Sequence, residues 1–235
     1  MSALWDRPSS GQRAALYIRS LIFTGTLRSG DRIAQDDIGD ALGFSRLPVR
    51  EAIIALEHEG LVTSEPHRGV FINPITPDTF RDQYELFGST LGIAIRLAAT
   101  RSGPAFVDQL EAINDHLQTA ADADEFDAAN DAFNSLIVER ACSPRLRAVL
   151  RVLSGIVPGN YFEEVPGGIA IQTAGAAAVV DALRKGDADT ASEACLHTMR
   201  AQAEAVVALL SSRGFFERQQ PAIAEPANTE RLEQR

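Results

Sequence analysis

The sequence has few cysteines, no long apolar run and no excess of positive charge. Its 235 residues include two cysteines, Cys142 and Cys195, which lie far apart and do not form a metal-type pair. Two buried free thiols in a reducing cytoplasm are favoured over a disulfide. No stretch approaches the ~20 apolar residues of a membrane span, and no signal peptide is visible. We therefore expect a cytoplasmic protein that does not span a membrane.

The formal net charge is −10, from 22 basic and 32 acidic residues. A protein that binds nucleic acid must present cations to the phosphate backbone, so this total argues against a nucleic-acid partner. The charge is unevenly distributed, however. Residues 1–75 hold eight arginines, no lysine and nine acidic residues, which gives a net charge of −1, whereas residues 76–235 carry −9. The acidity therefore belongs mainly to the second part of the chain.

The first 75 residues show three amphipathic helices followed by two short β-rich runs. Apolar periodicity predicts helices at about residues 12–24 and 35–42, and from Ser45 to Gly60. Gly43 occupies the place where a helix needs a left-handed exit residue, and Ser45 suits an N-cap. Residues 61–63 and 70–72 are rich in β-formers, and the segment 66–69 between them predicts a hairpin tip. This order of elements predicts a winged helix-turn-helix over residues 1–75.

The rest of the chain contains no convincing strands. Helices are expected at about residues 77–101, 104–121, 124–141, 144–157, 170–185 and 188–212. Short connections between such helices predict an all-α antiparallel bundle over residues 76–217, so the fold class is mainly α. The longest break, from 158 to 168, fits either a functional loop or a plain surface loop. Residues 218–235 are polar and show no apolar stripe, and we interpret them as a disordered tail.

The third predicted helix carries Arg46 and Arg50, which are four residues apart and therefore share one face. Arginine is well suited to guanine edges and to bidentate phosphate contact. Ser45 can offer its hydroxyl and backbone N–H to a phosphate, and Arg68 at the hairpin tip can reach a minor groove or the adjacent backbone. Two exposed arginines alone are usually only solvated charge, but the helix-turn-helix and the basic tip favour DNA binding. The acidic residues of this domain should then lie on its other faces.

The run from Ile18 to Ile72 resembles the DNA-binding domain of GntR-type bacterial regulators. The segments that carry the resemblance are GTLRSGDRI, DDIGDALGFSRLPVREAIIALEHEGLV and PHRGVFI. The resemblance implies DNA contacts from Ser45, Arg46, Leu47, Arg50, Arg68 and Gly69. Leu47 replaces the small hydroxyl residue usual in the family, and leucine can pack on a thymine methyl or against sugar. Some relatives carry a basic residue near the start of the second helix, where this chain has Asp36 and Asp37, which cannot help phosphate binding.

The helical remainder looks like the FCD-type effector domain of the FadR-type branch of that family. The resemblance rests on the helix count and on YELFGSTLGIAIRLAA, NDAFNSLIVERACSPRL and VVDALRKGDADTA. It implies a divalent metal that anchors a carboxylate effector. The ligands would be an Asp and a His four apart on one helix, and two His about 22 residues apart on the last two helices.

This chain does not keep that metal site. The aligned positions hold Asn130, Asn134, Ala176 and Thr198. Neutral amide oxygens compete poorly for such ions, so we predict no metal and no other cofactor. A rival interpretation is a shifted site that uses Asp131 and His197, each one residue out of register, although a lone His is more often simply hydrogen-bonded.

The same alignment changes the ligand that we expect. Phe87 and Leu91 stand where the family tends to show an Arg and a Glu facing the interior. The residues expected around the cavity are Phe87, Leu91, Asn130, Asn134, Ala176 and Thr198. Compared with the family, this cavity lacks the metal ligands, the Arg and the Glu. A hydrophobic effector such as an acyl or aromatic compound therefore fits it better than a small carboxylate. The alternative is that Phe87 and Leu91 fill the cavity and nothing binds.

These observations predict a ligand-responsive transcriptional regulator. It would be a homodimeric repressor on a palindromic operator in double-stranded DNA, released by a small-molecule effector. One alternative is a small-molecule binding or sequestering protein whose DNA function has lapsed. An α-helical enzyme is disfavoured, because the sequence has no P-loop, no GxGxxG and no activating context for its Ser, His and Asp residues. We therefore expect no catalytic residues.

Overall fold

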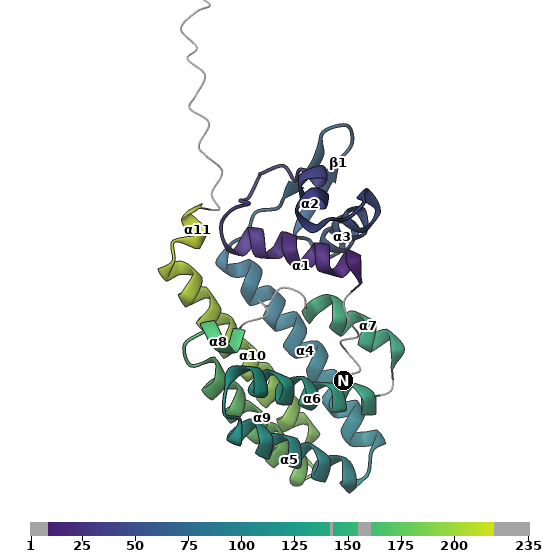
Figure 1. The fold of residues 1–235 in the computed structure, drawn as a ribbon. Helices are drawn as coiled ribbons and strands as arrows, with labels where there is room; N and C mark the ends of the chain where they lie inside the picture. Colours follow the sequence, from purple (N-terminus) through teal and green to yellow (C-terminus); the bar gives the residue numbers. More distant parts are fainter. Residues whose placement is uncertain (1–8, 142, 155–160, 219–235) are drawn as a thin grey trace, which may run out of the picture.

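The computed structural model describes residues 9–141, 143–154 and 161–218, whose path is drawn in Figure 1. Cys142, residues 155–160 and the expected tail from residue 219 onward lie outside the described residues. The first domain contains α1 (Ser10–Phe23), α2 (Gln35–Leu42), α3 (Arg46–His58), β1 (Val62–Glu65) and β2 (Gly69–Ile72). The second contains α4 (Pro77–Arg101), α5 (Pro104–Thr119), α6 (Ala123–Ala141), α7 (Pro144–Leu153), α8 (Tyr161–Glu164), α9 (Gly168–Arg184), α10 (Ala188–Ser212) and α11 (Phe215–Arg218).

The first domain is a helix-turn-helix with a hairpin wing, as the sequence predicts. Its two strands pair antiparallel, with Val62 opposite Ile72 and Glu65 opposite Gly69, and Arg32 adds an isolated bridge to Phe71. The core is formed by the apolar faces of α1, α3 and the wing. Its fully buried members include Ile18, Ile22, Val49, Leu56 and Val62.

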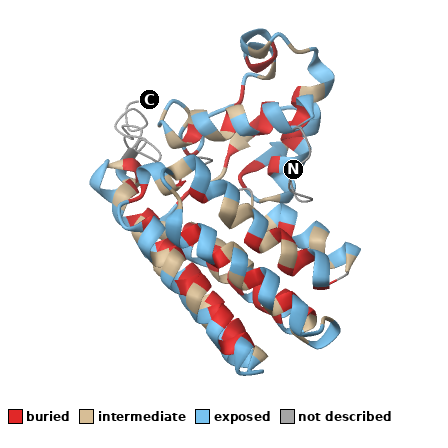
Figure 2. Ribbon diagram, turned by 60° about the horizontal axis from the view of Figure 1, so that its bottom comes forward, coloured by how far each residue is buried: buried red, intermediate tan, exposed pale blue. Residues whose placement is uncertain are grey.

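The second domain is a helical bundle built around the two longest helices, α4 and α10. These helices make the most extensive contact in the described structure, and α9 packs beside α10 while α6 packs against α4. Buried residues lie on the faces where helices meet, and exposed residues lie on the outer faces (Figure 2). The mainly α fold that the sequence predicts is therefore confirmed.

Most helix bounds agree with the sequence analysis, and the differences concern short elements. The helix expected over 144–157 is helical to Leu153, and residues 155–157 lie outside the described part. The break expected from 158 to 168 contains a single helical turn, α8. Another short helix, α11, follows α10. Both short helices have four residues, which is too few to show an apolar period.

An aromatic cluster joins the two domains. Phe215 on α11 lies 6.1 Å from Phe23 on α1 and 6.4 Å from Phe80 on α4, measured between ring centroids, and Phe216 lies 5.9 Å from Phe80. Phe80 and Phe215 are fully buried. One apolar cluster therefore continues from the first domain into the upper end of the bundle.

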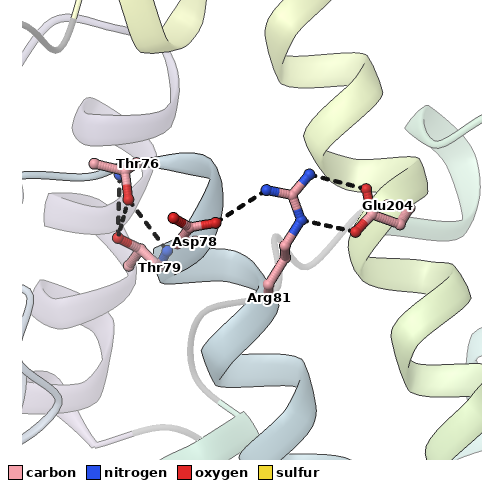
Figure 3. A network of polar contacts seen from close by, with 5 residues as sticks. All are labelled: Thr76, Asp78, Thr79, Arg81 and Glu204. Atoms are coloured by element: carbon pink, nitrogen blue, oxygen red, sulfur yellow. Dashed lines mark hydrogen bonds and ion pairs between the residues drawn. The ribbon is translucent and has the colours of Figure 1, made fainter.

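Polar contacts hold the start of α4 in place (Figure 3). Thr76 and Thr79 form a capping box at this helix end, and Pro77 occupies its first turn. Arg81 donates two hydrogen bonds to Glu204 on α10, at 2.7 and 3.0 Å, and a third to Asp78 at 3.0 Å. These contacts attach the N-terminal end of α4 to α10, close to the first domain.

Candidate functional site

A tight turn sets the position of α3 relative to α2. Gly43 has φ +66° and ψ 32°, the left-handed conformation expected of it, and the Phe44 N–H donates to the Gly39 carbonyl at 2.9 Å. A Cβ on Gly39 would lie 3.0 Å from the Phe44 carbonyl oxygen, so α2 lies close against the turn. Ser45 is the N-cap residue of α3, and its exposed side chain makes no capping hydrogen bond.

The outward face of α3 presents Arg46, Leu47 and Arg50. All three are exposed, and Leu47 retains 66% of its accessible surface. The opposite face buries Val49 and Ile53 in the core of the first domain. An exposed leucine between two arginines gives this face both cations for phosphate or guanine and an apolar contact for a thymine methyl.

The wing adds another basic residue to this surface. Arg68 at the hairpin tip is hydrogen-bonded to Glu65 and lies 5.6 Å from the centroid of the Phe71 ring. Gly69 has φ +118°, and a Cβ there would lie 2.5 Å from Nε of Arg32. The family resemblance implies a DNA contact from Gly69, and in the structure Gly69 also makes room for Arg32, an exposed arginine that was not predicted from the sequence to belong to this surface.

The expectation that acidic residues lie away from the basic surface is wrong for two of them. Asp36 accepts hydrogen bonds from Nε and Nη2 of Arg46 at 2.9 and 3.2 Å, and Glu65 pairs with Arg68. Asp36 is close to Arg46 because the tight turn brings the start of α2 beside the start of α3. Arg50 makes no ion pair with any residue that the structure describes, so the three basic residues differ in their partners.

The wing and α1 are fixed to α3 by its last turns. The Glu57 carboxylate accepts hydrogen bonds from the Ser64 N–H at 2.8 Å and from the Ser64 hydroxyl at 3.0 Å. Glu59 forms an ion pair with Arg19 on α1, and both side chains are nearly buried. These contacts hold Arg68 in a defined position relative to Arg46 and Arg50.

Two small neighbouring cavities lie inside the bundle. The first is lined by Leu91, Asn134, Ala176 and Thr198 among others and has a volume of about 20 Å³ open to a water-sized sphere. The second is lined by Phe87, Leu91, Asn134 and Asp131 among others and has about 40 Å³. A water needs roughly 10–15 Å³ of such volume, so each cavity has room for no more than a few waters.

The structure brings five of the six residues expected around the effector site to the walls of these cavities. Leu91 and Asn134 line both of them. The sixth, Asn130, lies one helical turn from Asn134, and its Oδ1 accepts a hydrogen bond from Nε2 of Gln172 at 2.7 Å.

A chain of side-chain amides crosses the bundle at this level. Nε2 of Gln202 on α10 donates to Oε1 of Gln172 on α9 at 2.6 Å, and Gln172 donates in turn to Asn130 on α6. Asn134 Nδ2 approaches the same Asn130 oxygen at 3.5 Å. Gln172 and Gln202 are buried, and neither was predicted from the sequence to belong to the site. A buried glutamine on the apolar face of a helix was the signal that could have identified them.

These residues do not fit the divalent metal that the family resemblance implies. Asn130 uses its carbonyl oxygen for amide hydrogen bonds, Ala176 has no ligating atom, and the Thr198 hydroxyl donates to the Ala194 carbonyl at 2.8 Å. Of the shifted pair, Asp131 lines the second cavity, whereas His197 is exposed and lines neither. Within the described ranges, no group of three or more His, Cys, Asp or Glu residues is placed to hold a metal ion.

The remaining cavity walls are uncharged. Cys195 lines the first cavity as a buried free thiol, and burial raises its pKa to about 12, so the thiol stays neutral. Outside the two cavities, burial raises the pKa of the Tyr84 and Tyr161 phenols, and the described residues provide neither hydroxyl with a hydrogen-bond partner. As far as the chain is described, no helix is both long enough and apolar enough to cross a membrane.

Two protein families match successive parts of the chain. Residues 11–72 match the family described as bacterial regulatory proteins of the gntR family, and residues 92–201 match the FCD domain. The first match covers the helix-turn-helix and wing, and the second covers the part of the bundle that contributes most residues to the walls of both cavities.

Proteins similar in sequence are named as transcriptional regulators. An uncharacterised HTH-type transcriptional regulator of Mycobacterium tuberculosis is 34% identical over 146 residues, which are 62% of this chain and 60% of that protein. The HTH-type transcriptional repressor RspR of Escherichia coli is 28% identical over 120 residues, 48% of this chain and 50% of that protein. This chain therefore aligns with about half to three fifths of these relatives. The solved structure of E. coli McbR/YncC has the same fold, with a TM-score of 0.56 at 21% identity, over 88% of this chain and 99% of that one.

Proposed function

Because this chain belongs to the GntR family of bacterial regulatory proteins and its bundle contains an FCD domain, we propose that it is a transcriptional repressor that responds to a small-molecule effector. It binds a palindromic operator as a homodimer and leaves the operator when the effector enters the bundle. One relative is named a transcriptional repressor, which supports repression over activation.

The observation that carries the DNA-binding function is the outward face of α3. A helix that follows a tight turn and presents exposed side chains at its N-terminal end can enter a major groove. Arg46 and Arg50 supply the cations and Leu47 the apolar contact on this face, while the bases of these side chains are fixed by the packed inner face. Arg68 on the wing reaches toward the neighbouring backbone or minor groove.

Replacing Arg46 and Arg50 together by alanine should abolish operator binding. Each good arginine contact with a base or phosphate supplies about 1–3 kcal/mol, so the double variant should lose about 2–6 kcal/mol, which is at least roughly 30-fold in affinity. The operator would first be selected from random DNA with the wild-type protein, and dissociation constants would then be measured by fluorescence anisotropy. Arg101→Ala is a matched control, because this arginine lies on α4, far from the helix-turn-helix, and should leave DNA affinity unchanged.

Both variants must remain folded, as judged by circular dichroism and thermal unfolding. If the wild-type protein shows no preference for any DNA sequence at low salt, the regulator function fails. A small-molecule binding or sequestering protein would then be the better interpretation.

Exposed apolar side chains support the dimer. Leu86 and Ile93 are exposed and lie seven residues apart on α4, while Val149 and Val152 are exposed on α7, which packs against α4. Large apolar side chains that are exposed to solvent on two adjacent helices are typical of a surface that binds another protein. A second copy of this chain would cover them and place two α3 helices on successive half-sites.

The proposed effector is uncharged and mainly apolar. The cavities are lined mainly by apolar side chains together with a few polar ones, Asp131 is the one charged residue among the described residues of their walls, and neither wall offers a carboxylate ligand a cation. The amide chain from Gln202 to Asn130 can rearrange to bind a carbonyl, ester or amide group. The cavities are too small for such a ligand, so its entry must displace Phe87 and Leu91.

In a thermal-shift and DNA-release screen, acyl thioesters and neutral aromatic compounds are expected to stabilise the protein and to release the operator. Small carboxylates should do neither, whether or not a divalent metal or a chelator is present. Gln172→Leu keeps the volume of the side chain but breaks the amide chain, so it should weaken binding about tenfold while the protein stays folded. Specific release by a small carboxylate that a chelator abolishes would refute this ligand class.

A further inference from the structure

Asp36 and Arg46 form a side-on, bidentate ion pair at the N-terminal end of α3. The Arg46 guanidinium donates from Nε to Asp36 Oδ1 at 2.9 Å and from Nη2 to Oδ2 at 3.2 Å. Both side chains are well exposed, at 81% for Arg46 and 66% for Asp36. The pair is therefore presented to any molecule that docks against the outward face of α3.

The geometry of this pair leaves one edge of the guanidinium available. Arginine has five N–H groups, and Asp36 accepts one from Nε and one from Nη2. The neighbouring end of the guanidinium, formed by one N–H of Nη1 and the second N–H of Nη2, is not used by Asp36 and carries two parallel donors. Guanine presents O6 and N7 side by side in the major groove, and this pair of acceptors matches two parallel donors.

The other basic residues of the surface are held differently. Arg68 is paired with Glu65 through Nη1 alone, and Arg50 makes no ion pair with the residues described. A paired cation attracts a phosphate less strongly than an unpaired one, because the neighbouring carboxylate offsets its charge. Arg50 is thus suited to phosphate, whereas Asp36 orients Arg46 and the pair that they form has little net charge.

We propose that Asp36 is a positioning residue that holds Arg46 for end-on recognition of a guanine in the operator half-site. The inference rests on the proposed DNA-binding function. Asp36 directs the guanidinium toward the base edge and keeps it from binding a nearby phosphate on non-specific DNA. A carboxylate that lowers total affinity therefore raises the preference for the correct sequence.

Asp36→Asn and Asp37→Asn provide a matched test. Both aspartates lie in the first turn of α2 and both are exposed, and Asp37 makes no ion pair within the described part of the chain. Each substitution removes one negative charge from the same helix end, so both change the general attraction to DNA alike. Only Asp36→Asn removes the carboxylate that holds Arg46.

The measurement is the ratio of affinities for the selected operator and for variants in which each guanine in turn is replaced by adenine, with the complementary base changed to match. Asp37→Asn should strengthen binding to all these DNAs to a similar extent and leave the ratios unchanged. Asp36→Asn should strengthen non-specific binding at least as much but reduce the ratio about tenfold at one guanine per half-site. Arg46→Ala should remove the preference for that same guanine.

Two results would overturn the proposal. In the first, Asp36→Asn and Asp37→Asn give ratios within twofold of each other at every guanine. In the second, the guanine that depends on Asp36 does not depend on Arg46. A wild-type protein without sequence preference would instead overturn the DNA-binding function itself, so the two failures are distinguishable.

Discussion

Phe215→Ala is expected to lower the free energy of unfolding by about 3–5 kcal/mol, the usual range for removal of a fully buried phenylalanine. Phe215 has no accessible surface and packs against Phe23 of the first domain and Phe80 of the bundle. Its ring is therefore shared by both domains, and its loss leaves a cavity at their junction. Chemical denaturation monitored by circular dichroism would measure the change.

Phe216→Ala is the matched control for this prediction. Phe216 is the neighbouring residue on the same short helix, and it also contacts Phe80, but it is only partly buried. Its removal should cost clearly less than the removal of Phe215. Equal losses for the two variants would mean that the shared core at the junction does not contribute as its burial indicates.

The junction also matters for control of DNA binding. An effector that moves α4 or α10 can change the orientation of the first domain only if the two domains move together. Phe80 lies on α4 and Phe215 follows α10, and both contact α1 through Phe23. We therefore expect Phe215→Ala to retain DNA binding below its unfolding temperature while effector-induced release becomes weaker.

The general fold could be predicted from the sequence because its signals are local. Gly43 marks the end of α2 since only a residue that tolerates positive φ suits that position, and Pro77 marks the first turn of α4. The helix periods then place Val49 and Leu56 in the core. By contrast, α8 and α11 are too short to show a period, and tertiary contacts of their aromatic residues hold them in place.

The site could be predicted only in part. Arg46 and Arg50 share a helix face by spacing alone, and Asn134 and Ala176 were identified by the family resemblance. The partners of these residues were missed, because Asp36 meets Arg46 across a turn and Gln202 meets Gln172 across two helices. Such pairings depend on how the helices pack, and spacing within one helix carries no information about them.

Gly175→Ala is expected to destabilise the protein by about 3 kcal/mol or more, because the site has no room for a methyl group. A Cβ at Gly175 would lie 2.5 Å from Cγ2 and 2.8 Å from Cβ of Thr198, and closer still to its hydroxyl oxygen. No rotation of the Thr198 side chain moves its own Cβ away, so α9 and α10 would have to separate.

The compensating change is Thr198→Gly, which removes the atoms that clash. The double variant Gly175→Ala with Thr198→Gly should recover most of the stability lost by Gly175→Ala, less about 1 kcal/mol for glycine within a helix. Gly103→Ala is the control, because its φ is −74° and no atom lies within 4 Å of the added Cβ. A Gly175→Ala protein as stable as Gly103→Ala would show that α9 and α10 are not in close contact.

This close contact determines where an effector can enter. Gly175 and Thr198 both line the first cavity, so the wall between α9 and α10 cannot move inward and is already closely packed. Space for a ligand must then open on the side of α4 and α6, where the second cavity lies behind Phe87 and Leu91. Movement of α4 would be transmitted to Phe80 at the domain junction, because both residues belong to the same continuous helix.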